Sequence, residues 1–352
     1  MRVAEQRTNN AHIAYLDRLR VLAAFAVVVL HVAAQNWYSA DISSTAWMVF
    51  NVYDSAVRWA VPVFAMISGV VFLSKEIPVK RIFTKYIPRL ITAYLFWSLV
   101  YALYHGTDRK TMLFHFFAGS FHMWYVPMLV GLYLCIPIYK KIVESDSLVR
   151  YFLGISFFCA FLLPYMLLLA GDFGSGLLAD YVPLVELKLN MVKLSMPLGF
   201  SAYFILGYYL HRVELSKKQE YVLYLLGLAG FAVTAVATQL ASQRTSAPNA
   251  DYYDEFALNT LFQAVAVFVF CKQHCRPKPL ADRVCAEISK ASFGIYWVHI
   301  LMRDLLDDKM MVNTCSFLPA ISVPVLSIVV FALSFGVSWL IGRIPVVKRY
   351  VL

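Results

Sequence analysis

Charged residues are scarce in this chain. Asp, Glu, Lys and Arg together make up 15% of its 352 residues, whereas 61% are hydrophobic. A water-soluble domain averages about 25% charged residues, so this chain has too few to cover a water-facing surface. The scarcity excludes a cytosolic enzyme, a secreted disulfide scaffold and a disordered regulator. A lipid bilayer must therefore be its solvent.

Cysteines are also few, and they form no recognisable framework. Cys271, His274, Cys275 and Cys285 stand close together in the sequence, but no second CxxC pair accompanies them. Of the six cysteines, we expect only Cys315 near the outer face, where no second cysteine is available to pair with it. We therefore predict no metal site and no intramolecular disulfide in the oxidising compartment.

Signs of a second domain are missing as well. No low-complexity tract, internal repeat or change of composition divides the sequence, so we expect one membrane domain over residues 1–352. The first apolar run resembles a secretion signal, but about twenty residues with both acids and bases precede it, so we expect a retained anchor. The missing repeat argues against a transporter built from inverted repeats.

Long apolar runs are what the sequence has in abundance. A membrane-spanning helix needs roughly 20 mostly apolar residues, whereas a barrel strand shows a weak alternation over about ten. The runs predict an all-α, polytopic helix bundle with about ten spans. Their approximate limits are 16–36, 50–73, 86–105, 122–142, 150–171, 195–211, 221–241, 256–273, 291–306 and 318–341.

Positive charge is distributed unevenly between the predicted loops. Of the 31 lysines and arginines, 23 fall on one side of the ten-span topology. Cytoplasmic loops of membrane proteins carry such an excess. We therefore expect both termini in the cytoplasm, and we interpret the net charge of +10 as a mark of topology, with no nucleic-acid partner.

Ionisable side chains within the spans are candidates for function, because they are costly in lipid. In the first span, Arg20 and His31 are 11 residues apart, which is about three helical turns and roughly 16 Å along one face. An arginine at the membrane rim binds anions, and a buried neutral imidazole acts as a general base. The alternative, with equal weight, is a snorkelling arginine and a structural histidine.

The second span carries a polar stripe of Asn51, Asp54, Ser55 and Arg58. Asp54 and Arg58 are four residues apart, which predicts an ion pair that lowers the cost of burying each charge. A structural role for this pair is favoured, with substrate contact as the alternative.

The ninth span presents a second histidine on a polar stripe. Ser292, Tyr296, His299 and Arg303 share one face of the predicted helix. Two spans with a histidine on a polar stripe are unusual for a chain that merely packs, so these residues are candidates for substrate contact.

Two groups at the membrane surfaces have ordinary explanations besides functional ones. A basic cluster before the third span either holds a phosphorylated ligand or follows the positive-inside rule, and the second explanation is favoured. An aromatic group opens the fourth span at the outer interface, where it forms an aromatic belt or stacks on an acceptor. The basic cluster is Lys80, Arg81, Lys85 and Arg89, and the aromatic group is His122, Trp124 and Tyr125.

These residues also resemble a known family. The segment YLDRLRVLAAFAVVVLH, with Arg20 and His31, resembles the opening signature of the acyltransferase 3 family of integral membrane O-acyltransferases. Four later stretches are similar to that family in order, so the resemblance covers essentially the whole chain. They are VPVFAMISG at 61–69, MWYVPMLVGLYLCIPI at 123–138, YFILGYYL at 203–210 and SFGIYWVHIL at 292–301.

The resemblance implies a function and a site. It implies transfer of an acyl group, usually acetyl from cytoplasmic acetyl-CoA, to a hydroxyl group of a surface carbohydrate or its lipid-linked precursor, in the inner membrane of a bacterium. His31 matches the essential catalytic histidine of the family, and Arg20 matches the arginine that supports it. The chain ends at Leu352, so it looks like the short family members, such as the enterobacterial common antigen and xanthan-type acetyltransferases, which have no added hydrolase-like domain.

One family motif is altered in this chain. The family often shows an Arg-x-x-Arg pair at the start of the third helix. The second position matches Arg89, but the first falls on Tyr86, with Lys85 and Arg81 nearby. The resemblance therefore leaves open which of the basic residues holds the phosphates of coenzyme A.

Residues and resemblance together suggest one mechanism. Acetyl-CoA enters from the basic side, and its pantetheine arm of about 15–20 Å spans the offset of roughly 16 Å to His31. His31 then deprotonates the acceptor hydroxyl, or carries the acetyl group itself as an acetyl-imidazole. His299, Tyr296 and Arg58 are candidates for stabilising the oxyanion.

Two other classes of function compete with this hypothesis. A secondary transporter for a small solute also uses buried charges and proline-bent helices, and it is the serious alternative. A purely structural protein comes third, because it has little reason to keep aligned polar stripes in lipid.

Overall fold

The computed structural model describes residues 14–175, 177–192, 195–275 and 278–345. Every regular element in these ranges is helical, which confirms the predicted all-α class. The α-helices are α1 (Ala14–Ala33), α2 (Thr45–Ser55), α3 (Ala60–Leu73), α4 (Val79–Arg81), α5 (Ile87–His105), α6 (Arg109–Ala118), α7 (Tyr125–Leu134), α8 (Ile136–Val143), α9 (Asp146–Ser156), α10 (Leu163–Phe173), α11 (Leu177–Val192), α12 (Ser195–Arg212), α13 (Lys217–Thr245), α14 (Leu258–His274), α15 (Pro279–Met310) and α16 (Pro319–Ile341). Four short 3₁₀ or π segments are η1 (Ile82–Tyr86), η2 (Phe121–Trp124), η3 (Phe157–Leu162) and η4 (Asp251–Tyr253).

Fewer helices meet the requirements of a membrane span than the ten that the sequence predicts. Among the described residues, six are long and apolar enough, or seven if a pair bent by 57° counts as one span. The six are Thr45–Leu73, Val79–His105, Asp146–Phe173, Lys217–Thr245, Asp251–His274 and Pro319–Ile341, and the bent pair is Arg109–Leu134 with Ile136–Val143. The two chain ends, for which we predict a cytoplasmic location, lie outside the described residues.

The helices that carry the polar stripes account for part of this difference. Helix α1 contains three charged residues in its first two turns, namely Asp17, Arg18 and Arg20. Helix α15 carries polar and charged side chains along its whole length. Both pack against other helices, since α1 contacts α15, α16, α3 and α2. Polar groups are tolerated at such depth where they face the bundle interior.

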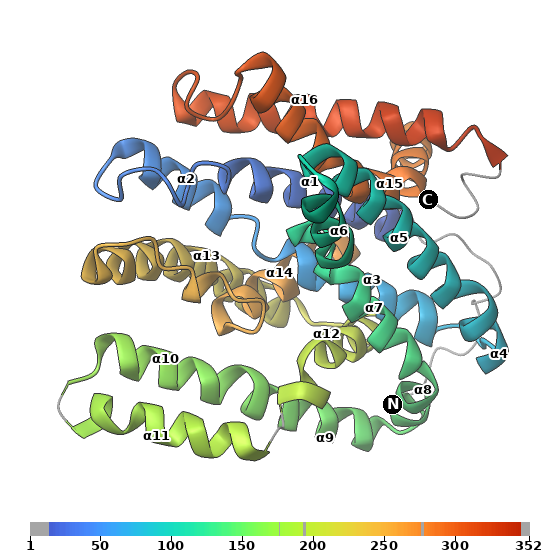
Figure 1. Cartoon of the computed structure of the whole chain (residues 1–352). Helices are drawn as coiled ribbons and strands as arrows, with labels where there is room; N and C mark the ends of the chain where they lie inside the picture. Colours follow the sequence, from blue (N-terminus) through green and yellow to red (C-terminus); the bar gives the residue numbers. More distant parts are fainter. Residues whose placement is uncertain (1–13, 176, 193–194, 276–277, 346–352) are drawn as a thin grey trace.

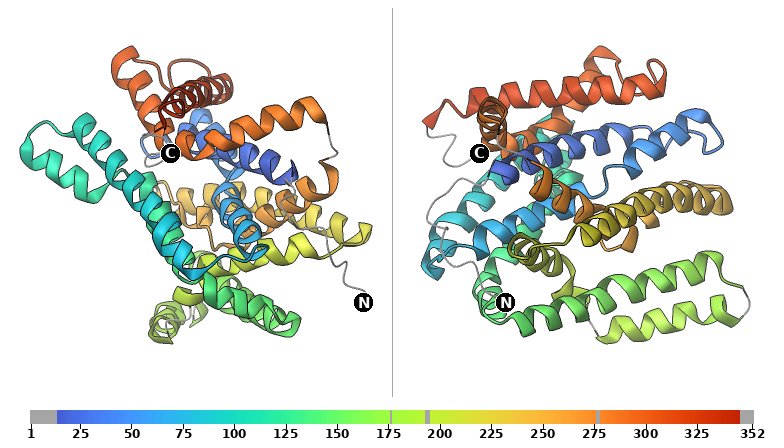
Figure 2. Two further views of the ribbon diagram at one scale, coloured as in Figure 1. Left: turned by 90° about the vertical axis from the view of Figure 1, so that its right-hand side faces the viewer. Right: turned by 180° about the vertical axis from the view of Figure 1, so that it is seen from behind.

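The molecule is a layered bundle. The two helices with polar stripes, α1 and α15, lie at its centre. Helices α2, α10, α11, α13 and α16 run alongside one another in Figure 1, and the view from behind in Figure 2 shows the same layers. Helices α1, α3, α14 and α15 lie between them and the α5–α6 hairpin, which stands out from the body in the left view of Figure 2. The central helices therefore meet at the place where the functional residues gather.

Two features of the backbone shape this centre. Helices α3 and α12 cross closely, because a Cβ atom on Gly69 would collide with the Phe204 carbonyl and one on Gly207 with the Met66 backbone. Glycine at positions 69 and 207 thus allows this close packing. The second span breaks between α2 and α3 at residues 56–59, just before Pro62, which has no N–H to donate to the carbonyl four residues earlier.

Candidate functional site

A cavity with a volume of about 590 Å³ lies among the central helices. It brings together Arg20, His31 and Arg89, which are far apart in the sequence. Helices α1, α3, α5, α7 and α15 and the break between α2 and α3 contribute its wall. The lining residues used below are Arg20, His31, Tyr38, Arg58, Tyr86, Arg89, His122, Trp124, Glu255, Ser289, Lys290 and Tyr296. We name this space the central channel.

His31 sits in the central channel with its protonation fixed by its neighbours. The Nδ1 atom of His31 lies 3.0 Å from the Val27 carbonyl oxygen and 3.0 Å from Nε2 of His299. The Nδ1 atom of His299 lies 2.8 Å from the Tyr296 carbonyl oxygen. A carbonyl oxygen only accepts hydrogen bonds, so both Nδ1 atoms must carry hydrogen when the rings are neutral. Nε2 of His299 then accepts from His31, and Nε2 of His31 keeps its lone pair for a ligand.

A third histidine completes the cluster. The ring centroid of His122 lies 5.2 Å from that of His299 and 6.3 Å from that of His31. Its side chain is buried, and Nδ1 lies 3.1 Å from the Ser120 hydroxyl. No group of three or more His, Cys, Asp or Glu side chains in the described ranges has the geometry to hold a metal ion. His31 and His122 line the channel, and His299 lies behind them.

Sequence reasoning underestimated His122. It grouped this residue with Trp124 and Tyr125 at the outer interface, as an aromatic belt or as a group that stacks on an acceptor. In the structure, η2 turns His122 inward while Trp124, 43% exposed, also reaches the channel wall. The available signal was a histidine beside two aromatic residues in a predicted span.

One end of the central channel is basic. Arg20, Arg89 and Lys290 all line it there. Arg20 donates to the Ser289 hydroxyl at 3.1 Å and lies 3.7 Å from the Asp17 carboxylate. We call this end the basic mouth.

The other two residues predicted for coenzyme A lie elsewhere. Lys85 and Arg81 are exposed and do not belong to the channel wall. The guanidinium of Arg81 lies instead 5.8 Å from the centre of the Tyr86 ring. The structure thus brings one residue of the predicted basic cluster, Arg89, to the channel.

The predicted ion pair on the second span is present. Arg58 donates to the Asp54 carboxylate, and the Asp54 side chain is fully buried. The Arg58 guanidinium also lies 3.8 Å from the centre of the Tyr253 ring. Arg58 lines the channel and Asp54 does not, so the guanidinium is the member of the pair that a ligand in the channel would meet.

The remaining predicted residues occupy different positions. Tyr296 lines the channel, and its hydroxyl donates to the His122 carbonyl oxygen at 2.9 Å. His299 is 1% exposed and lies behind His31, outside the channel wall. His299 therefore contacts His31 instead of a ligand in the channel.

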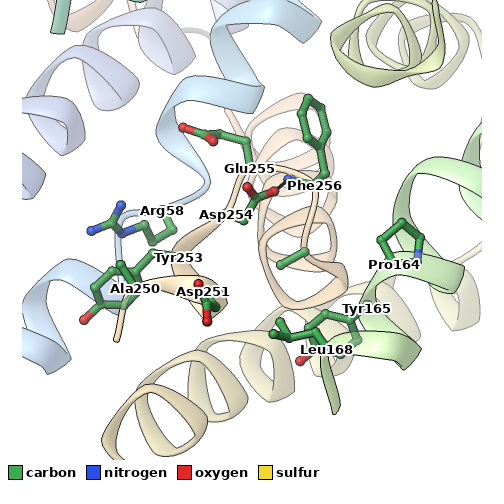
Figure 3. A pocket seen from close by; sticks show the side chains of 11 residues that line it. Arg58, Pro164, Tyr165, Leu168, Ala250, Asp251, Tyr253, Asp254, Glu255 and Phe256 are labelled. Carbon is green, nitrogen blue, oxygen red and sulfur yellow. Dashed lines mark hydrogen bonds between the residues drawn. The ribbon is translucent and has the colours of Figure 1, made fainter. Parts of the chain in front are cut away.

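A second cavity of about 440 Å³ adjoins the channel (Figure 3). Arg58 and Glu255 line both spaces. Asp251, Asp254 and several aromatic side chains complete its wall. Sequence reasoning assigned no role to these acids, because they lie in the connection between two apolar runs and no short motif marks them.

Comparison with known proteins gives one match. A family model described as an acyltransferase domain, of the acyltransferase 3 type, matches residues 13–343. No curated protein matches the chain, and no solved structure does. The match covers both helices that carry His31 and His299.

Proposed function

Because this chain belongs to the acyltransferase 3 family, we propose that it transfers an acetyl group from acetyl-CoA to a hydroxyl group of a carbohydrate acceptor. The observation that carries the proposal is the central channel, in which a basic mouth and an imidazole with a lone pair share one space of about 590 Å³. The acceptor is a surface polysaccharide, a glycolipid or a lipid-linked precursor, as in the short family members that modify enterobacterial common antigen.

The basic mouth suits the donor. Coenzyme A carries phosphate groups, and arginine forms strong charge-assisted bonds to phosphate. Arg20 and Arg89 hold these phosphates, and Lys290 adds a third positive charge. The thioester then reaches inward along α1, where His31 lies roughly 16 Å beyond Arg20 on the same helix.

His31 acts as the general base. Its Nε2 takes the proton from the acceptor hydroxyl, and the hydroxyl oxygen attacks the thioester carbonyl carbon. The tetrahedral intermediate collapses with loss of the coenzyme A thiolate, which receives the proton from the imidazolium. An acetyl-imidazole on His31 is the two-step version of the same chemistry.

Arg58 is the best placed of the three candidates for stabilising the oxyanion. His299 lies outside the channel wall, and the Tyr296 hydroxyl already donates to a carbonyl oxygen. Arg58 lines the channel and carries a permanent positive charge. A fixed charge near the developing oxyanion lowers the barrier more in a site that excludes water.

We assign the protein to the cytoplasmic membrane of a bacterium, with the basic mouth on the cytoplasmic side. Support comes from the excess of lysine and arginine on that side. Acetyl-CoA is a cytoplasmic metabolite, so the donor and the basic mouth then share a compartment.

A direct test uses purified protein in detergent with isotopically labelled acetyl-CoA and a glycan extract, with product detected by mass spectrometry. The wild type transfers the label, and its affinity for coenzyme A falls as salt concentration rises. His31→Ala lowers transfer by about 10²–10⁴-fold, the usual contribution of a positioned base. Coenzyme A binding and the melting temperature stay unchanged in this variant.

His274→Ala is the matched control, because this histidine is exposed at the end of α14 and lies outside both cavities. It retains wild-type transfer. Full activity of His31→Ala would contradict the proposed mechanism. Absence of coenzyme A binding, combined with solute uptake by vesicles that contain the protein, would favour the transporter instead.

A further inference from the structure

Carboxylic acids outnumber basic residues in the wall of the second cavity. Three of its residues are acids, Asp251, Asp254 and Glu255, and its one basic residue, Arg58, is paired with the buried Asp54. Its aromatic residues are Tyr165, Tyr253 and Phe256. We name this space the acidic cavity.

The acidic cavity is built by segments far apart in the sequence. Tyr165 extends from α10 toward η4, as Figure 3 shows, and its ring lies 6.2 Å from that of Tyr252. The connection between α13 and α14 supplies the three acids. Local bonds hold two of them, because Asp251 accepts from the Asn249 amide at 2.9 Å and Asp254 from the backbone N–H of Phe256 at 2.7 Å.

One polar group in the wall is left without a partner. The Tyr165 side chain is 8% exposed, and its hydroxyl has no hydrogen-bond partner in the described part of the chain. A buried hydroxyl without a partner costs about 1–3 kcal/mol. Because this oxygen is itself buried, its removal relieves the cost without changing the wall of the cavity.

The acidic cavity leads to the reactive histidine. Arg58 and Glu255 line both the acidic cavity and the central channel, and His31 lies in the channel beyond them. The channel therefore has a basic mouth and, toward the acidic cavity, a region lined by Glu255. The positive charge of the basic mouth favours an anionic ligand there. The negative charge of Glu255 favours a neutral or cationic ligand on the side of the acidic cavity.

We propose that the acidic cavity is the acceptor subsite and that it selects a neutral or cationic polyhydroxyl ring over an anionic one. The inference rests on the proposed function and deepens it. Carboxylates accept hydrogen bonds from sugar hydroxyls, and aromatic rings pack against the apolar C–H faces of a sugar. A volume of about 440 Å³ falls within the range of small-ligand sites. A carboxylate or phosphate on the acceptor ring meets like charge and is rejected.

The test uses three probes that differ in charge: methyl glucoside, methyl glucosaminide and methyl glucuronide. Binding to the intact protein is measured by calorimetry without donor, and O-acetylation is measured by mass spectrometry with acetyl-CoA. The neutral and cationic probes bind at least about tenfold more tightly than the glucuronide, as expected for like charges brought together.

Two variants test individual residues of the acidic cavity. Asp251→Asn combined with Glu255→Gln keeps the side-chain shapes and removes two charges, so it reduces the discrimination against glucuronide by roughly fivefold or more. Tyr165→Phe keeps the discrimination between the probes, while its melting temperature stays the same or rises because a buried hydroxyl without a partner is removed. Glu144→Gln, an exposed carboxyl paired with Lys141 outside both cavities, leaves binding and discrimination unchanged.

Equal binding of the three probes to the wild type would overturn the inference, as would discrimination that persists in the double variant. Failure of the proposed function would give different experimental results. Charge-selective binding without any acetyl transfer supports the acidic cavity and removes the acyltransferase mechanism. Acetyl transfer with no charge preference keeps the mechanism and removes the acidic cavity as the acceptor subsite.

Discussion

His31 and His299 form a hydrogen-bonded pair whose tautomers are set by backbone carbonyl oxygens. The two nitrogens that face each other are 3.0 Å apart, and carbonyl oxygens of Val27 and Tyr296 fix the hydrogens on both rings. His299 has no access to the channel, so it is a positioning residue. The arrangement resembles a base oriented by a second group in other hydrolytic and transfer sites.

Substitution of His299 tests this pairing. His299→Leu removes one of the two acceptors of the His31 Nδ1–H and leaves the Val27 carbonyl oxygen as the other, so we expect kcat to fall by roughly 10²-fold, the lower end of what a positioned base contributes. KM for acetyl-CoA stays unchanged, because the basic mouth is intact. His299→Gln restores part of kcat, since an amide oxygen accepts the same hydrogen. A His299→Leu enzyme with wild-type kcat would show that the pairing has no role in the reaction.

At the scale of elements, two helix interruptions and one close crossing build the site. The break before Pro62 moves Arg58 off the regular helix and lets it line both cavities. The short helix η2 turns His122 inward at the start of the fourth predicted span. The crossing of α3 and α12 depends on glycine at positions 69 and 207. Each of these features depends on a few neighbouring residues, but each shapes the wall of the central channel.

The crossing of α3 and α12 is tested by adding one methyl group. Gly69→Ala places a Cβ atom against the Phe204 carbonyl, so we expect a loss of about 1–3 kcal/mol in stability, as for other overpacked interiors. Gly131→Ala on α7 is the matched control, because nothing lies within 4 Å of its Cβ position. Thermal unfolding in detergent measures both variants. An unchanged melting temperature for Gly69→Ala would mean that the helices do not cross so closely.

At the scale of the whole molecule, two adjoining cavities differ in the charge of their walls. The basic mouth lies where Arg20, Arg89 and Lys290 meet, and the acidic cavity joins the channel through Arg58 and Glu255. His31 lies in the space between. If the charge bias of the loops sets the orientation, the basic mouth faces the cytoplasm.

Labelling of Cys315 tests this orientation. Cys315 is exposed in the connection between α15 and α16, which we expect on the outer side. Burial and the nearby Asp307 raise the pKa of its thiol, so the reactive thiolate and the rate of labelling increase with pH. The test uses a variant whose only cysteine is Cys315. We expect a membrane-impermeant maleimide to label this cysteine in cells whose outer membrane has been opened and whose inner membrane is intact. Labelling only after lysis of the inner membrane would show the opposite orientation.

Helix periodicity allowed part of the site to be predicted from the sequence. It put Arg20 and His31 on one face of α1, and both line the central channel. It also predicted the ion pair between Asp54 and Arg58, because partners four residues apart meet on any helix. The positions of Lys85 and Arg81 were less predictable, since basic residues collect near a membrane surface whether or not they bind a ligand.

The amino-acid sequence alone determined that the protein is a helical membrane protein, and it predicted that buried polar side chains mark its function. These conclusions depend on composition and on spacing within one helix. Only the tertiary structure decided that His31 meets His299 across 268 positions, that His122 joins them and that the acidic cavity opens toward the same channel. Periodicity fixes which side chains share a face of a helix, but packing between distant segments decides which faces meet.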